Sequence, residues 1–115
     1  MHSSKNPQLD ALKDRMGARV IAILEGYKTS SVDYLNVLSS PSSSKNDMIE
    51  AAHSLKSSSA ILGLSDVNET CEKLERTLID AQENELESIR SLVLDLDVLH
   101  KDSLAYIERE ISALG

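Results

Sequence analysis

The sequence predicts an all-α fold, an antiparallel four-helix bundle with a short additional N-terminal helix. Its 115 residues are 41% hydrophobic and 27% charged, which suits one folded domain with a single core. Only four Gly and two Pro interrupt the chain, so a few long helices are favoured over many short strands. Apolar residues recur at helical spacing, and the sequence has no strand-type alternation and no repeat of about 20 to 50 residues. Since the aromatic residues are three Tyr without Phe or Trp, we expect an aliphatic core.

The chain is expected to begin with a flexible segment, residues 1–6, followed by a single helical domain over residues 7–115. Asn6 can cap a first helix, and Pro7 suits its first position. Gly17 ends this short helix. Its apolar stripe consists of Leu9, Leu12 and Met16.

A second helix is predicted over residues 18–38, because its apolar residues keep a helical period throughout. Thr29 to Ser31 weaken the pattern locally, so a break at that point is the alternative. Residues 39–43 form a loop by composition, with Pro41 among four serines. The stripe consists of Val20, Ile21, Leu24, Tyr27, Tyr34, Leu35 and Leu38.

Three further helices follow. Ser44 with Asp47 resembles a capping box for the third, which runs to Leu62 and stops at Gly63. Ser65 or Asp66 is expected to cap the fourth, with the stripe Val67, Cys71, Leu74, Leu78 and Ala81. Asn84 with Glu87 is expected to cap the fifth, with the stripe Leu86, Ile89, Leu92, Val93, Leu96, Leu99, Tyr106, Ile107 and Ile111.

The third helix separates an apolar seam from a face that carries a histidine. At 100° per residue, the core seam lies within about ±40° of one direction, and His53 projects roughly 120° to 140° away from it. The seam consists of Met48, Ala52, Leu55, Ser59 and Leu62. The neighbours of His53 are Ile49, Lys56, Ser57 and Ala60, with Glu50 one step further round. The exposed flank of the imidazole is therefore lined by small side chains that leave it accessible to a partner protein.

The side chains on this face suit nucleophilic chemistry. An imidazole nitrogen is a competent nucleophile at neutral pH. Lys56, one turn along the helix, can reach the oxygens of a phosphoryl group and offset negative charge that develops there. The sequence has no Gly-rich phosphate loop, so we expect no transfer of phosphate from ATP.

The run from His53 to Gly63 resembles the active helix of histidine-containing phosphotransfer (HPt) domains, whose pattern is roughly His-x-Leu-Lys-Gly-small-small-x-x-Leu-Gly. The match continues through Val67, Cys71, Leu74 and Glu75, so the resemblance spans residues 49–75. It implies a phosphorelay intermediate of two-component signal transduction, with His53 as phosphoacceptor and Lys56 compensating phosphoryl charge. The implied partners are response-regulator receiver domains and a hybrid sensor histidine kinase. No cofactor is implied in this chain, because the metal ion used in such transfers belongs to the acidic pocket of the receiver.

The chain departs from the family pattern at Ser57, where Gly is usual. Ser is still small, so access to the imidazole is retained. Glu75 stands where family members often carry a polar side chain that hydrogen-bonds and orients the imidazole, and the alternative is a plain surface charge. Ser57, Ala60, Gly63 and Glu75 are thus candidate supporting residues. Ile49 and Glu50 are candidates for partner docking, with receiver specificity expected from Ile49, Ala60 and the exposed side of the second helix.

A second interpretation is a non-catalytic helical bundle that binds a receiver or kinase through the same face. Such a degenerate relative would normally lose the histidine or surround it with bulk, whereas both His53 and Lys56 are present. We also expect a monomer, either as a free protein or as part of a hybrid sensor kinase.

Composition excludes several other functions. A net charge of −7 argues against nucleic-acid binding, and no apolar run approaches the roughly 18 to 20 residues that span a membrane. There is no secretory signal pattern. The single cysteine, Cys71, allows no internal disulfide, which fits a cytoplasmic protein, and its place in an apolar stripe predicts burial.

The remaining candidate residues are expected to be structural or solvated. His53 and Glu50 make at most a pair of ligands, so no metal site is predicted. His2 and His100 lack the surroundings of His53 and are predicted to be solvated. Three acidic residues are expected on an ordinary solvated face: Glu83, Glu85 and Glu87.

Overall fold

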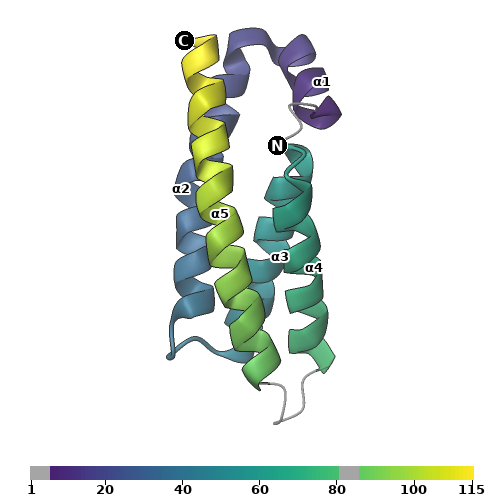
Figure 1. Ribbon diagram of the computed structural model, residues 1–115, viewed down its shortest axis with the longest axis vertical. Coiled ribbons are helices and arrows are strands. Elements are labelled where there is room, and N and C mark those ends of the chain that lie inside the picture. Colours follow the sequence, from purple (N-terminus) through teal and green to yellow (C-terminus); the bar gives the residue numbers. More distant parts are fainter. Residues whose placement is uncertain (1–5, 81–85) are drawn as a thin grey trace.

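The computed structural model describes residues 6–80 and 86–115, and every element within these two ranges is helical. The elements are α1 (Pro7–Met16), the short 3-10 turn η1 (Gly17–Arg19), α2 (Val20–Ser39), α3 (Lys45–Ile61), α4 (Ser65–Asp80) and α5 (Leu86–Leu114). Helices α2 to α5 run antiparallel along the long axis, and α1 lies across one end of the bundle (Figure 1). The predicted fold class is therefore confirmed.

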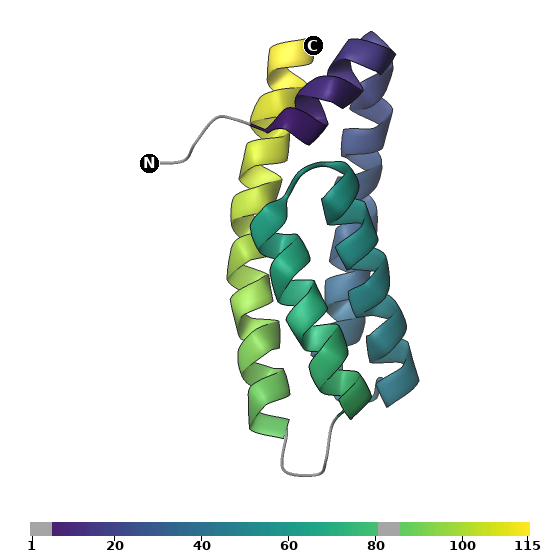
Figure 2. The same ribbon diagram turned by 90° about the vertical axis from the view of Figure 1, so that its right-hand side faces the viewer.

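Each long helix packs against two neighbours. Helix α3 contacts α2 and α4, and α5 contacts the same two helices from the other side, so α3 and α5 are diagonal in the bundle. Figure 2 shows α4 in front, between α3 and α5, with α2 behind. As expected, the core is largely aliphatic, and Tyr27 and Cys71 are its only other members among the described residues. Its fully buried large residues are Leu9, Val20, Leu24, Leu55, Leu62, Leu74, Leu96 and Ile107.

Helix α2 is continuous through Thr29 to Ser31, so the alternative of a break is wrong. The hydroxyl of Thr29 donates to the carbonyl of Glu25 one turn earlier, at 3.4 Å, which satisfies the side chain without disturbing the helix. Ser31 is fully buried, and its hydroxyl contacts Nε2 of His100 at 2.7 Å. The serine therefore supplies a polar partner inside the bundle.

His100 is 4% exposed, so the prediction of a solvated side chain is wrong. That prediction relied on the charged residues beside it in the sequence. On α5 it lies four residues after Leu96 and seven before Ile107, which places it on the same buried face as these two core residues. The position of His100 around the helix therefore determines its burial, and the polarity of its neighbours in the sequence does not.

Asn6 falls in the segment that the sequence predicts to be flexible, but it is buried and bonded to three elements. Its Oδ1 accepts from the backbone N–H of Leu9 at 3.1 Å, as expected of a helix cap. Its Nδ2 donates to the carbonyl of Leu62 at 2.8 Å and to the hydroxyl of Tyr106 at 3.2 Å. The cap could be predicted from the sequence, whereas the other two bonds depend on how α1 packs across the bundle.

The starts of the last two helices agree with the prediction only in part. Helix α4 begins at Ser65 itself and has Asp66 in its first turn, so neither residue precedes the helix as a cap. The predicted cap at Asn84, together with His2, Glu83 and Glu85, lies outside the described residues. Glu87 is solvent-exposed, as expected.

None of the helices in residues 6–80 and 86–115 is long and apolar enough to cross a membrane.

Candidate functional site

Helix α3 is fixed at both ends by the residues that the sequence indicated. At its start, the hydroxyl of Ser44 accepts from the backbone N–H of Asp47 at 3.0 Å. At its end, Gly63 adopts a φ of +69°, its N–H donates to Ala60, and the N–H of Leu64 donates to Ser59. These two bonds form a Schellman motif, which favours glycine at the left-handed position. The caps place His53 in the middle of a regular helix.

Four of the five residues of the predicted core seam are buried, and the fifth, Met48, is partly buried. His53 projects away from this seam with 60% of its side chain exposed. Ser57 and Ala60 are also exposed on this helix, and Glu50 is exposed one turn before. Ile49 is partly buried against the core. The small residues therefore leave the imidazole open on one flank, as the sequence predicted.

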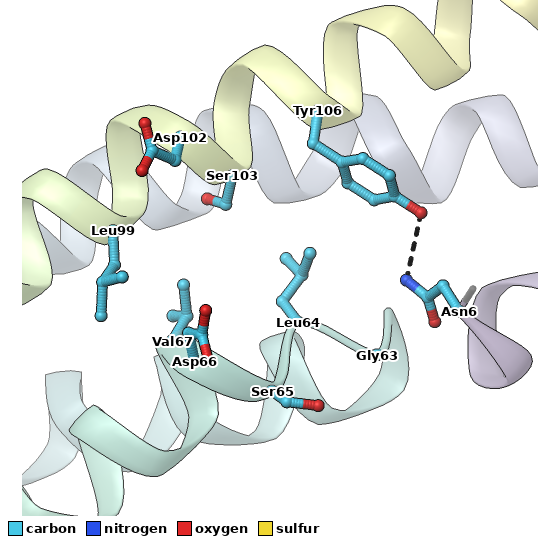
Figure 3. Close-up of a pocket in the computed structure, with 10 residues that line it drawn as sticks. All are labelled: Asn6, Gly63, Leu64, Ser65, Asp66, Val67, Leu99, Asp102, Ser103 and Tyr106. Atoms are coloured by element: carbon cyan, nitrogen blue, oxygen red, sulfur yellow. Dashed lines mark hydrogen bonds between the residues drawn. The ribbon is translucent and has the colours of Figure 1, made fainter. Parts of the chain in front are cut away.

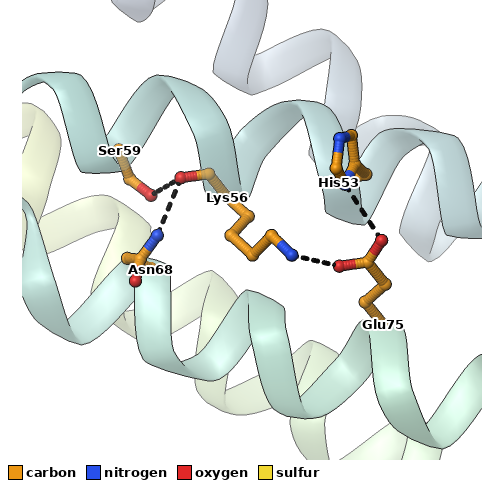
Figure 4. Close-up of polar contacts among 5 residues, drawn as sticks. All are labelled: His53, Lys56, Ser59, Asn68 and Glu75. Atoms are coloured by element: carbon orange, nitrogen blue, oxygen red, sulfur yellow. Dashed lines mark hydrogen bonds and ion pairs between the residues drawn. The ribbon is translucent and has the colours of Figure 1, made fainter.

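Glu75 of α4 lies beside His53 and Lys56 and contacts both (Figure 4). Its Oε2 is 3.0 Å from Nδ1 of His53, and its Oε1 accepts from Nζ of Lys56 at 2.6 Å. The Glu75 side chain is only 15% exposed, and Lys56 is partly buried. One carboxylate thus links the imidazole to the ammonium.

These contacts assign the protons of the site. The hydrogen bond from Lys56, with a second from His53, lowers the pKa of Glu75, so the carboxylate is ionised at neutral pH. An ionised carboxylate only accepts hydrogen bonds. Nδ1 of His53 must therefore carry the hydrogen in this contact, which leaves the lone pair of the neutral ring on Nε2.

Asn68 was not singled out by the sequence, yet it fixes the register of α3 against α4. Its Nδ2 donates to the carbonyl of Lys56 at 2.9 Å, and the buried hydroxyl of Ser59 donates to the same carbonyl at 2.9 Å (Figure 4). With the contact between His53 and Glu75, these bonds align the two antiparallel helices at two levels. Asn68 is half-buried on α4, and its polar amide was the only sign of this role in the sequence.

A cavity of about 280 Å³ lies elsewhere, between the start of α4 and α5. Figure 3 shows its lining, where Tyr106 from α5 meets Asn6 at one edge. The lining residues are Asn6, Gly63, Leu64, Ser65, Asp66, Val67, Leu99, Asp102, Ser103 and Tyr106. His53 is not among them, so the imidazole stands on an open surface and not in this cavity.

The described residues support neither a metal site nor a reactive cysteine. Within the part of the chain that the structure describes, no three His, Cys, Asp or Glu side chains are grouped closely enough to hold a metal ion. Cys71 is buried as predicted, and this burial raises the pKa of its thiol to about 12. The thiol therefore remains protonated at neutral pH and is a poor nucleophile.

Comparison with known proteins gives one family match. The family model described as Hpt domain matches residues 22–114, which include almost all of the four bundle helices and the whole His53 site. No curated protein and no solved structure gave a significant match. Members of this family carry out histidine phosphotransfer in the phosphorelays of two-component signalling and interact with receiver domains and histidine kinases. The chain belongs to the Hpt domain family.

Proposed function

We propose that His53 accepts a phosphoryl group from the aspartate of one receiver domain and passes it to the aspartate of another. The observation that carries this proposal is the hydrogen bond from Nδ1 of the exposed His53 to Glu75 at 3.0 Å. It holds the ring in the tautomer whose Nε2 can act as nucleophile. The small side chains of Ser57 and Ala60 leave room for a partner to approach that nitrogen.

The proposed step exchanges one bond to phosphorus for another. The lone pair of Nε2 attacks the phosphorus of the aspartyl phosphate, the P–O bond to the aspartate breaks, and the aspartate leaves as a carboxylate. The product ring carries phosphate on Nε2 and hydrogen on Nδ1, so it is formally cationic. The adjacent carboxylate of Glu75 stabilises that positive charge, and the reverse sequence with a second receiver returns the site to its initial state.

Lys56 and Glu75 have complementary parts in this proposal. Lys56 lies one turn from His53, so its ammonium can leave Glu75 and contact the oxygens of the arriving phosphoryl group. Glu75 keeps its bond to the ring throughout. The metal ion that assists such transfers would reside in the acidic pocket of the receiver, and we assign no cofactor to this chain.

The test is transfer of labelled phosphate from a receiver domain that has been phosphorylated with acetyl phosphate. The wild-type chain should gain a label that is lost in acid and stable in alkali, as expected of phosphohistidine, and a second receiver should then remove it. His53→Gln should gain none. Labelling of His53→Gln at the wild-type level would overturn the proposal, and binding of the receiver without any transfer would favour a non-catalytic interaction module.

A further inference from the structure

Two exposed isoleucines lie near His53 on α3 and α4. Ile61 is 58% exposed, and Ile79 is 57% exposed. No other large apolar side chain on these two helices is as exposed. Their positions relative to the imidazole indicate what they can contact.

Ile79 lies beside the His53 site on α4. It follows Glu75 by four residues, so the two share a helix face and are one turn apart. Because α3 and α4 are antiparallel and Glu75 is level with His53, Ile79 is level with Ile49, one turn before His53. The partly buried Ile49 and the exposed Ile79 therefore extend the surface of the site towards the end of α4.

Ile61 lies in the opposite direction along the bundle. It follows His53 by eight residues, which corresponds to about 12 Å along the axis and a rotation of about 80°. Lys56 is turned towards α4 by its bond to Glu75, and Ile61 is rotated the other way, towards α2. The two exposed isoleucines thus flank the imidazole diagonally.

The chemistry requires the partner to be centred near His53, because its aspartyl phosphate must reach the imidazole. An interface of ordinary size covers about 800 Å² on each partner, a disc of roughly 16 Å radius. Helix geometry places Ile79 about one turn from the level of His53 and Ile61 about 12 Å further along the axis than His53, so both fall within roughly that radius. A partner that reaches His53 therefore covers Ile61 and Ile79 as well, and withdrawing their apolar surface from water stabilises the complex only if the partner presents apolar side chains at the same places.

We propose that Ile61 and Ile79 are apolar anchors of the surface on which the phosphorylated receiver docks. The expected occupant is a receiver domain with apolar side chains on both sides of its acidic pocket. This inference rests on the proposed function. It assigns affinity to the two isoleucines, whereas the reactivity of the imidazole remains with His53, Lys56 and Glu75.

The chain provides a matched control on its far side. Val98 is 60% exposed on α5, which is diagonal to α3 and packs against α2 and α4 only on its inner face. A partner centred on His53 does not extend around the bundle to this residue. Val98→Ser therefore removes a similar exposed apolar group without touching the proposed surface.

The experiment compares Ile61→Ser, Ile79→Ser, the double variant and Val98→Ser in transfer from a receiver phosphorylated with acetyl phosphate. Each isoleucine variant should raise KM for the phosphoreceiver by about fivefold, with kcat nearly unchanged, because serine cannot supply the apolar surface that isoleucine buries on binding. Val98→Ser should match wild type. Labelling of His53 by phosphoramidate, which needs no docking, should be the same in all four variants.

The outcomes separate this inference from the proposed function. Wild-type KM in the double variant would overturn the docking assignment while leaving His53 as acceptor. Equal losses with phosphoramidate and with the receiver would also overturn it, since the isoleucines would then affect the imidazole or the fold. Labelling of His53→Gln would instead contradict the proposed function itself.

Discussion

At the scale of single residues, the site depends on a carboxylate that serves two partners. Glu75 accepts hydrogen bonds from both His53 and Lys56, and its charge is balanced by the ammonium in the absence of phosphate. A neutral amide at this position could orient the imidazole, but it could not stabilise a cationic phosphohistidine ring as strongly. The carboxylate should therefore influence both the orientation and the charge of the ring.

Substitution of Glu75 should separate these two effects. Glu75→Gln retains an acceptor for Nδ1 and should slow transfer less than Glu75→Ala, which leaves the ring without a partner. For Glu75→Ala we expect a loss of about tenfold, on the order of 1.4 kcal/mol in the barrier. Nitrogen NMR should report an Nδ1–H tautomer of His53 in wild type and a mixture in Glu75→Ala. An unchanged tautomer ratio in Glu75→Ala would show that the carboxylate does not position the ring.

Ser57 tests whether the open flank matters. The residue is exposed one turn after His53, and Ser57→Arg places a long side chain in the expected approach path. Arginine is a good helix former, so circular dichroism and melting should be nearly unchanged. Transfer in both directions should fall by about tenfold, roughly 1.4 kcal/mol in the barrier. A wild-type transfer rate would mean that the partner does not approach across this flank.

At the scale of elements, the α3–α4 turn joins three parts of the chain. A side chain at Gly63 would place its Cβ 1.9 Å from Oδ1 of Asn6, and the φ of +69° is itself unfavourable for other residues. Asn6 in turn bonds Leu62 and Tyr106. The glycine is therefore required by its conformation and by the close approach of α1.

Gly63→Ala should accordingly destabilise the protein by about 2 kcal/mol or more, since left-handed backbone alone costs about 1 kcal/mol and the contact with Asn6 must be broken. Gly26→Ala is the matched control. Gly26 lies inside α2, where an added Cβ would meet no neighbouring side chain or helix within 4 Å. The alanine should therefore stabilise α2 by about 0.5 to 1 kcal/mol. Urea unfolding of both variants measures the difference, and equal effects of the two substitutions would contradict the close packing of α1 at the turn.

The sequence alone was sufficient to predict the features of the fold and the site that a local pattern of residues determines. The apolar period placed Cys71 and Leu55 in the core, and the small residues around His53 indicated an exposed imidazole. The sequence was insufficient to predict contacts that depend on how two helices are aligned with each other. The bonds of Lys56 to Asn68 and to Glu75 require α3 and α4 to be aligned, which no local pattern specifies. The contact of Glu75 with His53 was indicated only by the family resemblance. The prediction for His100 failed for a related reason, because the polarity of its neighbours obscured its place on the buried face.

At the scale of the whole molecule, the bundle contains a buried polar cluster between α2 and α5. Nε2 of His100 contacts Ser31, and the hydroxyl of Ser103 bonds the carbonyl of His100 and contacts the hydroxyl of Tyr27 at 3.1 Å. Burial lowers the pKa of His100, and the carboxylate of Asp97 offsets this only in part. The packing of these two helices therefore favours the neutral imidazole.

This cluster predicts a loss of stability in mild acid. Because the pKa of His100 is lower in the folded state, the unfolded chain binds more protons once the pH falls below about 6.5, and the free energy of unfolding decreases from that point downwards. The carboxyl group of Glu75, whose folded pKa is also lowered, contributes only below its usual value of 4.5. Urea unfolding from about pH 7.5 to about pH 5, a range that brackets the ordinary histidine pKa, should show the decrease. His100→Leu should flatten the profile, and an equally steep profile in that variant would assign the effect to other groups.

The position of His53 on one open surface also has a kinetic consequence. In the proposed function a single imidazole on α3 serves both the donor and the acceptor of phosphate, and each partner of ordinary size covers the same area around it. The two partners therefore compete for the protein and cannot form a ternary complex with it. Transfer should follow a ping-pong scheme, with parallel double-reciprocal lines and inhibition by excess unphosphorylated acceptor. Intersecting lines would require a second docking surface.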